Sequence, residues 1–275
     1  MDTATTQSTD QKTADAFASS WNNLPTGSVY TTDQFVDWFA PVSKEDVSGK
    51  SILELGCGNG SLMSHLPLWQ PFLIEGVDLG DSVISCQKNM AITGFRNFKI
   101  TQGDLTEFTG QGYDLVYCIG VLHHLKIPLK GFEAVLRNVK PGGRFHCWVY
   151  AREGNAVIIY IVDPIRKVVS KLPWWFTKYF VATPLVVPYY AYAKIISLSK
   201  IFRKLPLYEY SCWIAKREFA FFRHVAFDQL VTPQTTYISK KTIEQWLNSY
   251  PEINPGSTYI IFRNGNSWKF GGRKK

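Results

Sequence analysis

The chain has 275 residues, 45% of them hydrophobic and 15% aromatic, which suffices for one catalytic domain that carries a sizeable insertion. Its five cysteines are odd in number and form no C-x-x-C pair, so neither a disulfide framework nor a zinc site is expected, and no metal is predicted. The formal net charge of +8 is uneven, because residues 1–150 carry 11 Lys/Arg against 15 Asp/Glu and residues 151–275 carry 19 against 7.

The first predicted elements follow a polar tail, residues 1–13, which lacks the apolar segment of an export signal and is expected to be disordered. A cytoplasmic location is therefore expected. Short amphipathic patterns predict N-terminal helices within 14–24 and 34–39. Strands and helices then alternate up to residue 150, which requires a parallel sheet with helices on both faces. The predicted strands are Ser51–Leu55, Phe72–Val77, Phe98–Thr101, Tyr113–Ile119 and Arg144–Tyr150, and the predicted helices are Ser61–Leu66, Asp81–Ala91 and Leu129–Val139.

This alternation stops after the fifth strand. Residues 151–236 are rich in aromatic residues, prolines and basic residues, and we expect them to form a helical insertion. A helix capped by Ser239 and a hairpin that turns at Asn264-Gly265 then close the core over residues 237–275. The predicted fold is thus α/β, a doubly wound, seven-stranded, mainly parallel sheet over residues 14–150 and 237–275, with the insertion after strand five.

The first strand runs into the segment Glu54-Leu-Gly-Cys-Gly-Asn-Gly60, an acidic residue followed by glycines at alternate positions. Glycines let the backbone turn tightly and approach a ligand where a Cβ would collide. The spacing is neither G-x-G-x-x-G nor a Walker loop, because position 61 is Ser and no G-K-[ST] follows. Asp78 and Asp104 end the next two strands, at the edge where ligands bind in open α/β sheets.

The order and spacing of these motifs resemble the class I S-adenosylmethionine-dependent methyltransferases over about residues 50–150. The resemblance implies S-adenosylmethionine (SAM) as cofactor, with S-adenosylhomocysteine as its product. It implies that Asp78 accepts hydrogen bonds from the ribose hydroxyls and that Asp104 holds the adenine amino group, whereas the alternative for both is a helix N-cap. The implied cofactor-binding residues are Glu54, Gly56, Cys57, Gly58, Gly60, Asp78, Leu79, Asp104, Leu105 and Ile119.

His123 and His124 follow the fourth strand in Leu122-His-His-Leu125, which resembles the small-molecule branch that includes ubiquinone and natural-product methyltransferases. An activated methyl donor leaves the protein to align the acceptor and, for a hydroxyl, to remove its proton. Histidine titrates near neutrality and suits that task. We predict His124, and with less support His123, as the catalytic base. The alternative for each is a hydrogen bond to the loop.

The resulting hypothesis is methyl transfer to a small or lipid-like acceptor, at a hydroxyl oxygen. The alternatives are a tRNA methyltransferase that uses the basic second half, and a pseudo-enzyme that binds the cofactor and serves as a binding partner. No base-reading motif is present, so nucleic acid is not expected as a partner. The apolar run 181–193 is too short to span a bilayer, and it fits peripheral contact with an anionic membrane, an acceptor lid or a homodimer interface.

Overall fold

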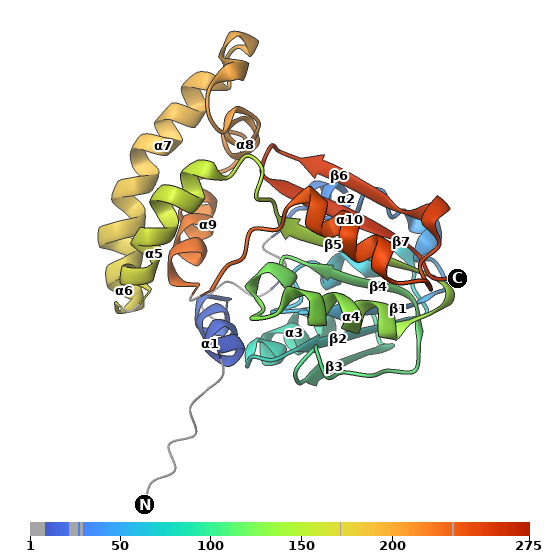
Figure 1. Ribbon diagram of the computed structural model, residues 1–275. Helices are drawn as coiled ribbons and strands as arrows, with labels where there is room; N and C mark the ends of the chain where they lie inside the picture. Colours follow the sequence, from blue (N-terminus) through green and yellow to red (C-terminus); the bar gives the residue numbers. More distant parts are fainter. Residues whose placement is uncertain (1–8, 22–26, 28–29, 171, 233) are drawn as a thin grey trace, which may run out of the picture.

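The computed structural model describes residues 9–21, 27, 30–170, 172–232 and 234–275. Its centre is a seven-stranded sheet in the order β3-β2-β1-β4-β5-β7-β6 (Figure 1). The first five strands pair in parallel, and β7 runs antiparallel between β5 and β6, which confirms the predicted fold class. The strands are β1 (Ser51–Leu55), β2 (Leu73–Asp78), β3 (Phe98–Gln102), β4 (Tyr113–Ile119), β5 (Val139–Tyr150), β6 (Tyr259–Arg263) and β7 (Ser267–Arg273).

Helices cover both faces of this sheet because successive strand residues point to opposite sides. In β4, Tyr117 packs into the core under helices α2 (Thr32–Phe39) and α3 (Ser82–Ile92). Its neighbour Val116 packs into the other core, under α4 (Pro128–Asn138) and α10 (Lys240–Ser249). The two cores hold the strand ends in place and so position the loops that follow them.

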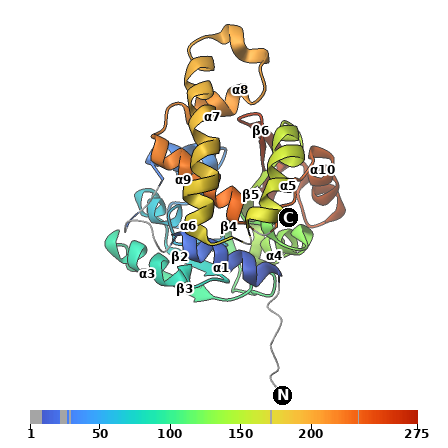
Figure 2. The ribbon, with the colours of Figure 1, turned by 90° about the vertical axis from the view of Figure 1, so that its left-hand side faces the viewer.

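The insertion after β5 is helical, as predicted, and stands beside the sheet with two small hydrophobic clusters of its own (Figures 1 and 2). It contacts helix α1 (Thr9–Trp21) through α9. No helix within the described part of the chain is long and apolar enough to cross a membrane. The insertion comprises η4 (Ile158–Val162), α5 (Asp163–Val169), α6 (Trp174–Phe176), η5 (Thr177–Ala182), α7 (Thr183–Ile196), η6 (Lys200–Lys204), α8 (Tyr208–Ile214) and α9 (Phe219–Val231).

Several boundaries differ from the sequence-based expectations, and three of them have a clear physical reason. Helix α1 begins at Thr9, inside the predicted disordered tail, where Asp10 accepts a hydrogen bond from the Lys126 backbone N–H (2.7 Å); residues 1–8 of that tail lie outside the described residues. The helix expected over Ser61–Leu66 is the 3-10 segment η2 (Met63–Trp69), which contains Pro67, a residue without a backbone N–H. Strand β5 begins five residues early because Gly142 and Gly143 bond to Lys274.

Candidate active site

The loop after β1 depends on its three glycines for different reasons. Gly56, Gly58 and Gly60 all have positive φ angles, of 83°, 51° and 76°. A Cβ on Gly56 would lie 2.4 Å from a methyl carbon of Val121, and one on Gly60 would lie 2.6 Å from the Cys86 sulfur. A Cβ on Gly58 would meet no atom within 4 Å. Gly56 and Gly60 therefore let the loop pack closely against Val121 and Cys86. Gly58 instead lines a cavity, where its missing side chain leaves open space.

Asp78, at the end of β2, fixes the same loop. Its Oδ2 accepts the Gly58 N–H (2.8 Å), and its Oδ1 accepts the Gly80 N–H (2.9 Å) and the Ser82 hydroxyl (3.2 Å). Burial raises the pKa of Asp78, although these hydrogen bonds favour the carboxylate. Asp78 lines the cavity, and each carboxylate oxygen has two lone pairs, so the side chain can bind a ligand hydroxyl while it holds the loop.

Asp104, after β3, also lines the cavity. Its Oδ1 accepts the Thr106 backbone N–H (2.8 Å) and the Thr106 hydroxyl (2.7 Å). The alternative for Asp104 was a helix N-cap, but no helix lies in the described segment between β3 and β4, and these bonds belong to a turn that engages only one of the two carboxylate oxygens. Asp104 thus serves the turn and borders the cavity at the same time.

Glu54 is buried at the end of β1, where the Tyr117 hydroxyl donates to its Oε2 (2.6 Å). Burial, with a smaller contribution from the charge of Asp78, raises the pKa of Glu54 to about 8. Glu54, Asp78, Asp104 and Asp10 make up what we call the acidic end of the cavity. The described lining includes a single cationic side chain, Arg263, so the acidic end favours a cationic ligand.

His124 lines the cavity and is 8% exposed. Its Nδ1–H donates to the carbonyl oxygen of Gln234 (3.0 Å), with the Thr235 hydroxyl 3.2 Å from the same nitrogen. Because a carbonyl can only accept, the proton of the neutral ring lies on Nδ1 and the lone pair on Nε2. Burial lowers the pKa of His124 to about 4, which keeps the ring neutral at physiological pH.

His123 has a different environment. It is fully buried, its ring lies 4.1 Å from that of Tyr150 between centroids, and it is not among the residues that line the cavity. Neither ring nitrogen has a hydrogen-bond partner among the described residues. Burial holds the pKa of His123 well below its usual range. Of the two predicted histidines, only His124 is placed to reach a ligand.

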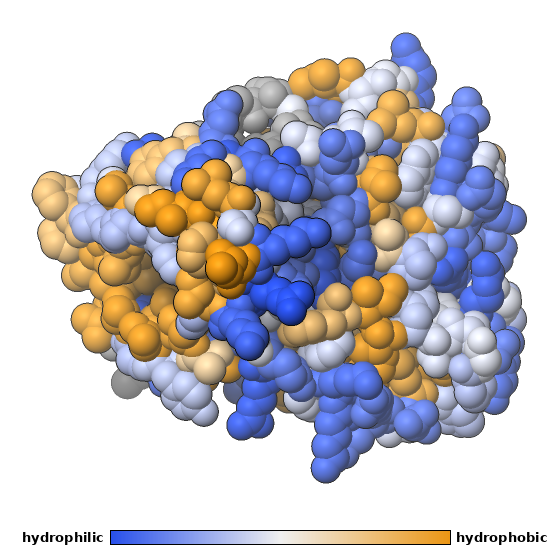
Figure 3. All heavy atoms as spheres, turned by 90° about the horizontal axis from the view of Figure 1, so that it is seen from above, coloured by the Kyte–Doolittle hydropathy of each residue, from blue (hydrophilic) through white to orange (hydrophobic). Residues whose placement is uncertain are grey.

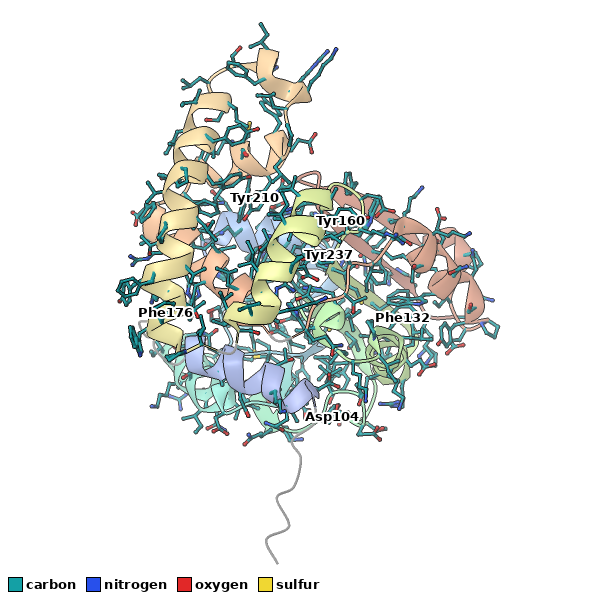
Figure 4. The ribbon with its side chains drawn as sticks, turned by 60° about the vertical axis from the view of Figure 1, so that its left-hand side comes forward. Asp104, Phe132, Tyr160, Phe176, Tyr210 and Tyr237 are labelled. Carbon is teal, nitrogen blue, oxygen red and sulfur yellow. The ribbon has the colours of Figure 1, made fainter. Side chains whose placement is uncertain are left out.

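Much of the remaining lining is aromatic, and Figure 4 shows that Tyr210 lies far from Asp104, another residue of the lining. We call this part the aromatic end, formed by Trp38, Trp148, Tyr150, Tyr210, Trp213, Phe221 and Arg263. The Arg263 side chain is 8% exposed, and its Nε donates to Asp37 (2.8 Å). Its guanidinium lies over the rings of Trp38 and Trp213, 5.8 and 5.5 Å from their centroids.

The cavity lining contains most of the predicted site residues. Gly60 and His123 are the exceptions. Sequence reasoning missed the contribution of α1, where Asp10, Thr13 and Ala14 line the cavity, because this segment carries no motif. It offered an acceptor lid as one role of the insertion but did not name the residues of the insertion that line the cavity. The predicted residues that line the cavity are Glu54, Gly56, Cys57, Gly58, Asp78, Leu79, Asp104, Leu105, Ile119 and His124.

Comparisons with known proteins indicate the type of domain. Residues 46–155 match a family model described as a methyltransferase domain. The ubiquinone biosynthesis O-methyltransferase of Pseudomonas savastanoi pv. phaseolicola is 29% identical over 119 residues, which are 42% of this chain and 51% of that protein. The tRNA U34 carboxymethyltransferase of Desulfotalea psychrophila is 30% identical over 102 residues, which are 36% and 32%. The chain thus spans about half or less of the length of these relatives.

Among solved structures, the fold resembles that of the magnesium protoporphyrin IX methyltransferase from Synechocystis PCC 6803, which was solved with bound SAM. The TM-score is 0.55 at 13% identity, over 99% of this chain and 100% of that one. Similarity at this identity concerns the fold. The strand order, the glycine loop and the family match together define a class I SAM-dependent methyltransferase domain. Residues 46–155 carry the family match, and the sheet is completed by the C-terminal hairpin.

Proposed function

We propose that the protein transfers the methyl group of SAM to a small or lipid-like acceptor, at a hydroxyl oxygen. The observation that carries the proposal is that His124 lines the same cavity as the acidic and aromatic ends. SAM supplies a methyl group on a positively charged sulfur, and its ammonium group is also cationic. The acidic end has the carboxyl groups of Asp78 and Asp104 and the open space at Gly58 that such a molecule needs, and Glu54 can ionise when a cation binds beside it.

His124 would accept the proton of the acceptor hydroxyl at Nε2. The hydrogen bond from Nδ1–H to the Gln234 carbonyl holds the ring in the orientation and tautomer that this step requires. A pKa of about 4 makes His124 a weak base, so it is best matched to a hydroxyl that is itself acidic, such as a phenol or an enol. An ordinary alkyl alcohol would be a poor match.

The aromatic end supports an acceptor with a flat or apolar body. Trp148 and Tyr150 of β5 face the cavity together with Tyr210 and Trp213 of α8. Arg263 and Lys269 both lie beside a single carboxylate, that of Asp37, so this end carries an excess of positive charge. An electron-rich or acidic substituent on the acceptor would be favoured there.

Labelled methyl transfer tests the proposal. The purified protein is incubated with methyl-labelled SAM and, in separate reactions, with an organic extract of cells, with simple phenols and with total tRNA. We expect label in an organic-soluble product that depends on the protein. Label in tRNA would favour the nucleic-acid alternative, and SAM binding without label in any fraction would favour the pseudo-enzyme.

A further inference from the structure

The outer surface of helix α7 is apolar although it faces solvent. Six residues spaced three or four apart are exposed along η5, α7 and the turn that follows, and none of them is polar. Phe180 is 63% exposed, Ile195 58% and Leu198 82%. We call this row the outer stripe, and its residues are Phe180, Pro184, Val187, Ala191, Ile195 and Leu198.

The opposite face of the same helix accounts for its packing in the fold. Val186 and Ala193 are buried in a cluster with residues of α8 and α9. The helix is therefore apolar on both sides, whereas a helix at the surface of a soluble domain has one polar side. Packing within this chain thus explains the inner face, whereas the outer stripe stays exposed to solvent, with Phe180 in contact with the exposed rings of Trp175 and Phe176.

Charge shows what kind of partner would cover the stripe. Residues 164–208, which include all of α7, contain eight Lys/Arg and no Asp/Glu. Lys200, Arg203 and Lys204 of η6 are exposed beside Leu198, and Lys167 of α5 is exposed as well. Seen from above, hydrophobic residues gather over the insertion with hydrophilic residues next to them (Figure 3). An apolar stripe bordered by cations matches an anionic, amphiphilic surface.

The length and direction of the outer stripe determine how α7 would lie on such a surface. From Phe180 to Leu198 the stripe extends over 18 residue steps, about 27 Å at 1.5 Å per residue, parallel to the helix axis. A row along one side of a helix makes contact when the helix lies flat, not when it crosses a bilayer. Exposed aromatic side chains continue the surface beyond the N-terminal end of the row, at Trp175, Phe176 and Tyr179.

We propose that the outer stripe and the basic residues of η6 dock this protein onto the surface of an anionic phospholipid bilayer, with α7 lying in the plane of the interface. Helix α7 packs on α8 and α9, whose residues Tyr210 and Phe221 line the cavity. The docked face is therefore the outer side of the wall that bounds the aromatic end. Docking requires neither cofactor nor acceptor and stands independently of the proposed methyl transfer.

Vesicle co-sedimentation at low salt tests the docking surface. Vesicles of phosphatidylcholine are compared with vesicles that also contain phosphatidylglycerol. The stripe variant is Phe180→Ser with Ile195→Ser, and its matched control is Phe72→Ser with Ile92→Ser, two residues that are 64% and 66% exposed on the sheet domain. We expect the wild type to bind the anionic vesicles, the stripe variant to bind at least tenfold more weakly, and the control to bind as the wild type does.

A charge pair completes the test. Lys200→Gln with Lys204→Gln should weaken binding by about fivefold per lysine, whereas Lys88→Gln with Lys130→Gln, which removes the same charge elsewhere, should not. All of these residues are exposed, and unchanged thermal unfolding verifies folding. No binding of the wild type to anionic vesicles would overturn the proposal, as would equal loss in variant and control. A dimer that dissociates in the stripe variant, without lipid binding, would assign the stripe to a second copy.

Discussion

Asp78 has two roles that meet in one carboxylate. It holds the glycine loop through Gly58 and Gly80, and it borders the cavity where the ribose of SAM is expected. Hydrogen bonds from these glycines and from the Ser82 hydroxyl favour the carboxylate form of this acid, whereas burial raises its pKa. Removing the side chain therefore affects the loop and the ligand together.

Asp78→Ala should weaken SAM binding by about 1 to 3 kcal/mol, because buried donors of the loop and of the ligand lose their acceptor. Titration calorimetry measures the change. Asp81→Ala is the control, since Asp81 is a nearby exposed acid that does not line the cavity. Equal SAM affinity for Asp78→Ala and the wild type would contradict the assignment.

Glu54 predicts a proton linkage. With a pKa of about 8, it is mostly protonated at pH 7 in the free protein. A cationic ligand favours the carboxylate and lowers that pKa, so binding should release close to one proton. Below the free pKa, affinity should consequently rise as the pH rises from 6 to 7. Calorimetry in buffers of different ionisation enthalpy detects the release. Glu54→Gln should abolish it, and a buffer-independent enthalpy in the wild type would refute the linkage.

His124→Ala should reduce turnover by roughly a hundredfold or more, because general-base catalysis is lost, while the SAM affinity changes little. With a pKa of about 4, the wild-type rate should not fall with His124 protonation until the pH drops below about 5. His123→Ala is an informative comparison, since His123 does not line the cavity. Near-normal turnover of His124→Ala would make this histidine structural.

At the level of helices and strands, the elements with a clear sequence pattern were predicted, and those without such a pattern were not. Strands β1 and β4 match their expected bounds because short apolar runs between turn residues define them. The alternation of strands and helices along the chain predicts which residues lie at the carboxyl edge of the sheet. Most residues of the acidic end lie at that edge and were therefore predictable. The aromatic end was not predictable, because Tyr210 and Phe221 reach the cavity only through the packing of the insertion. The role of α1 was not predictable either, because it depends on Asp10, which belongs to no recognisable sequence motif.

Helix α10 permits an independent test of the fold. Its expected cap, Ser239, accepts a hydrogen bond from the Thr242 N–H (3.1 Å). Ser239→Ala should lower the free energy of unfolding by about 1 kcal/mol without altering SAM binding, because Ser239 does not line the cavity. Chemical denaturation measures the loss. Ser249→Ala, at the other end of the helix, is the control, and an equal effect of both substitutions would argue against a specific cap.

In the whole molecule, the acidic half and the basic half of the chain have different roles. The net negative residues 1–150 contribute the carboxylates that suit a cationic cofactor. The net positive residues 151–275 contribute the insertion, with Tyr210, Trp213 and Phe221 of the aromatic end, and Arg263. One cavity runs between the two halves, and α1 and α9 contact each other beside it. Both reactants of the proposed transfer would therefore meet between segments that are far apart in sequence.

A crystal structure of the protein with S-adenosylhomocysteine tests the central claim most directly, because that claim is that this single cavity holds the cofactor and exposes its sulfur to His124. We predict electron density for the adenosine beside Gly58, Asp78 and Asp104, the amino acid end near Glu54, and the sulfur facing the part of the cavity that His124 and Tyr150 line. Density for the ligand elsewhere, or a sulfur turned away from His124, would contradict the account.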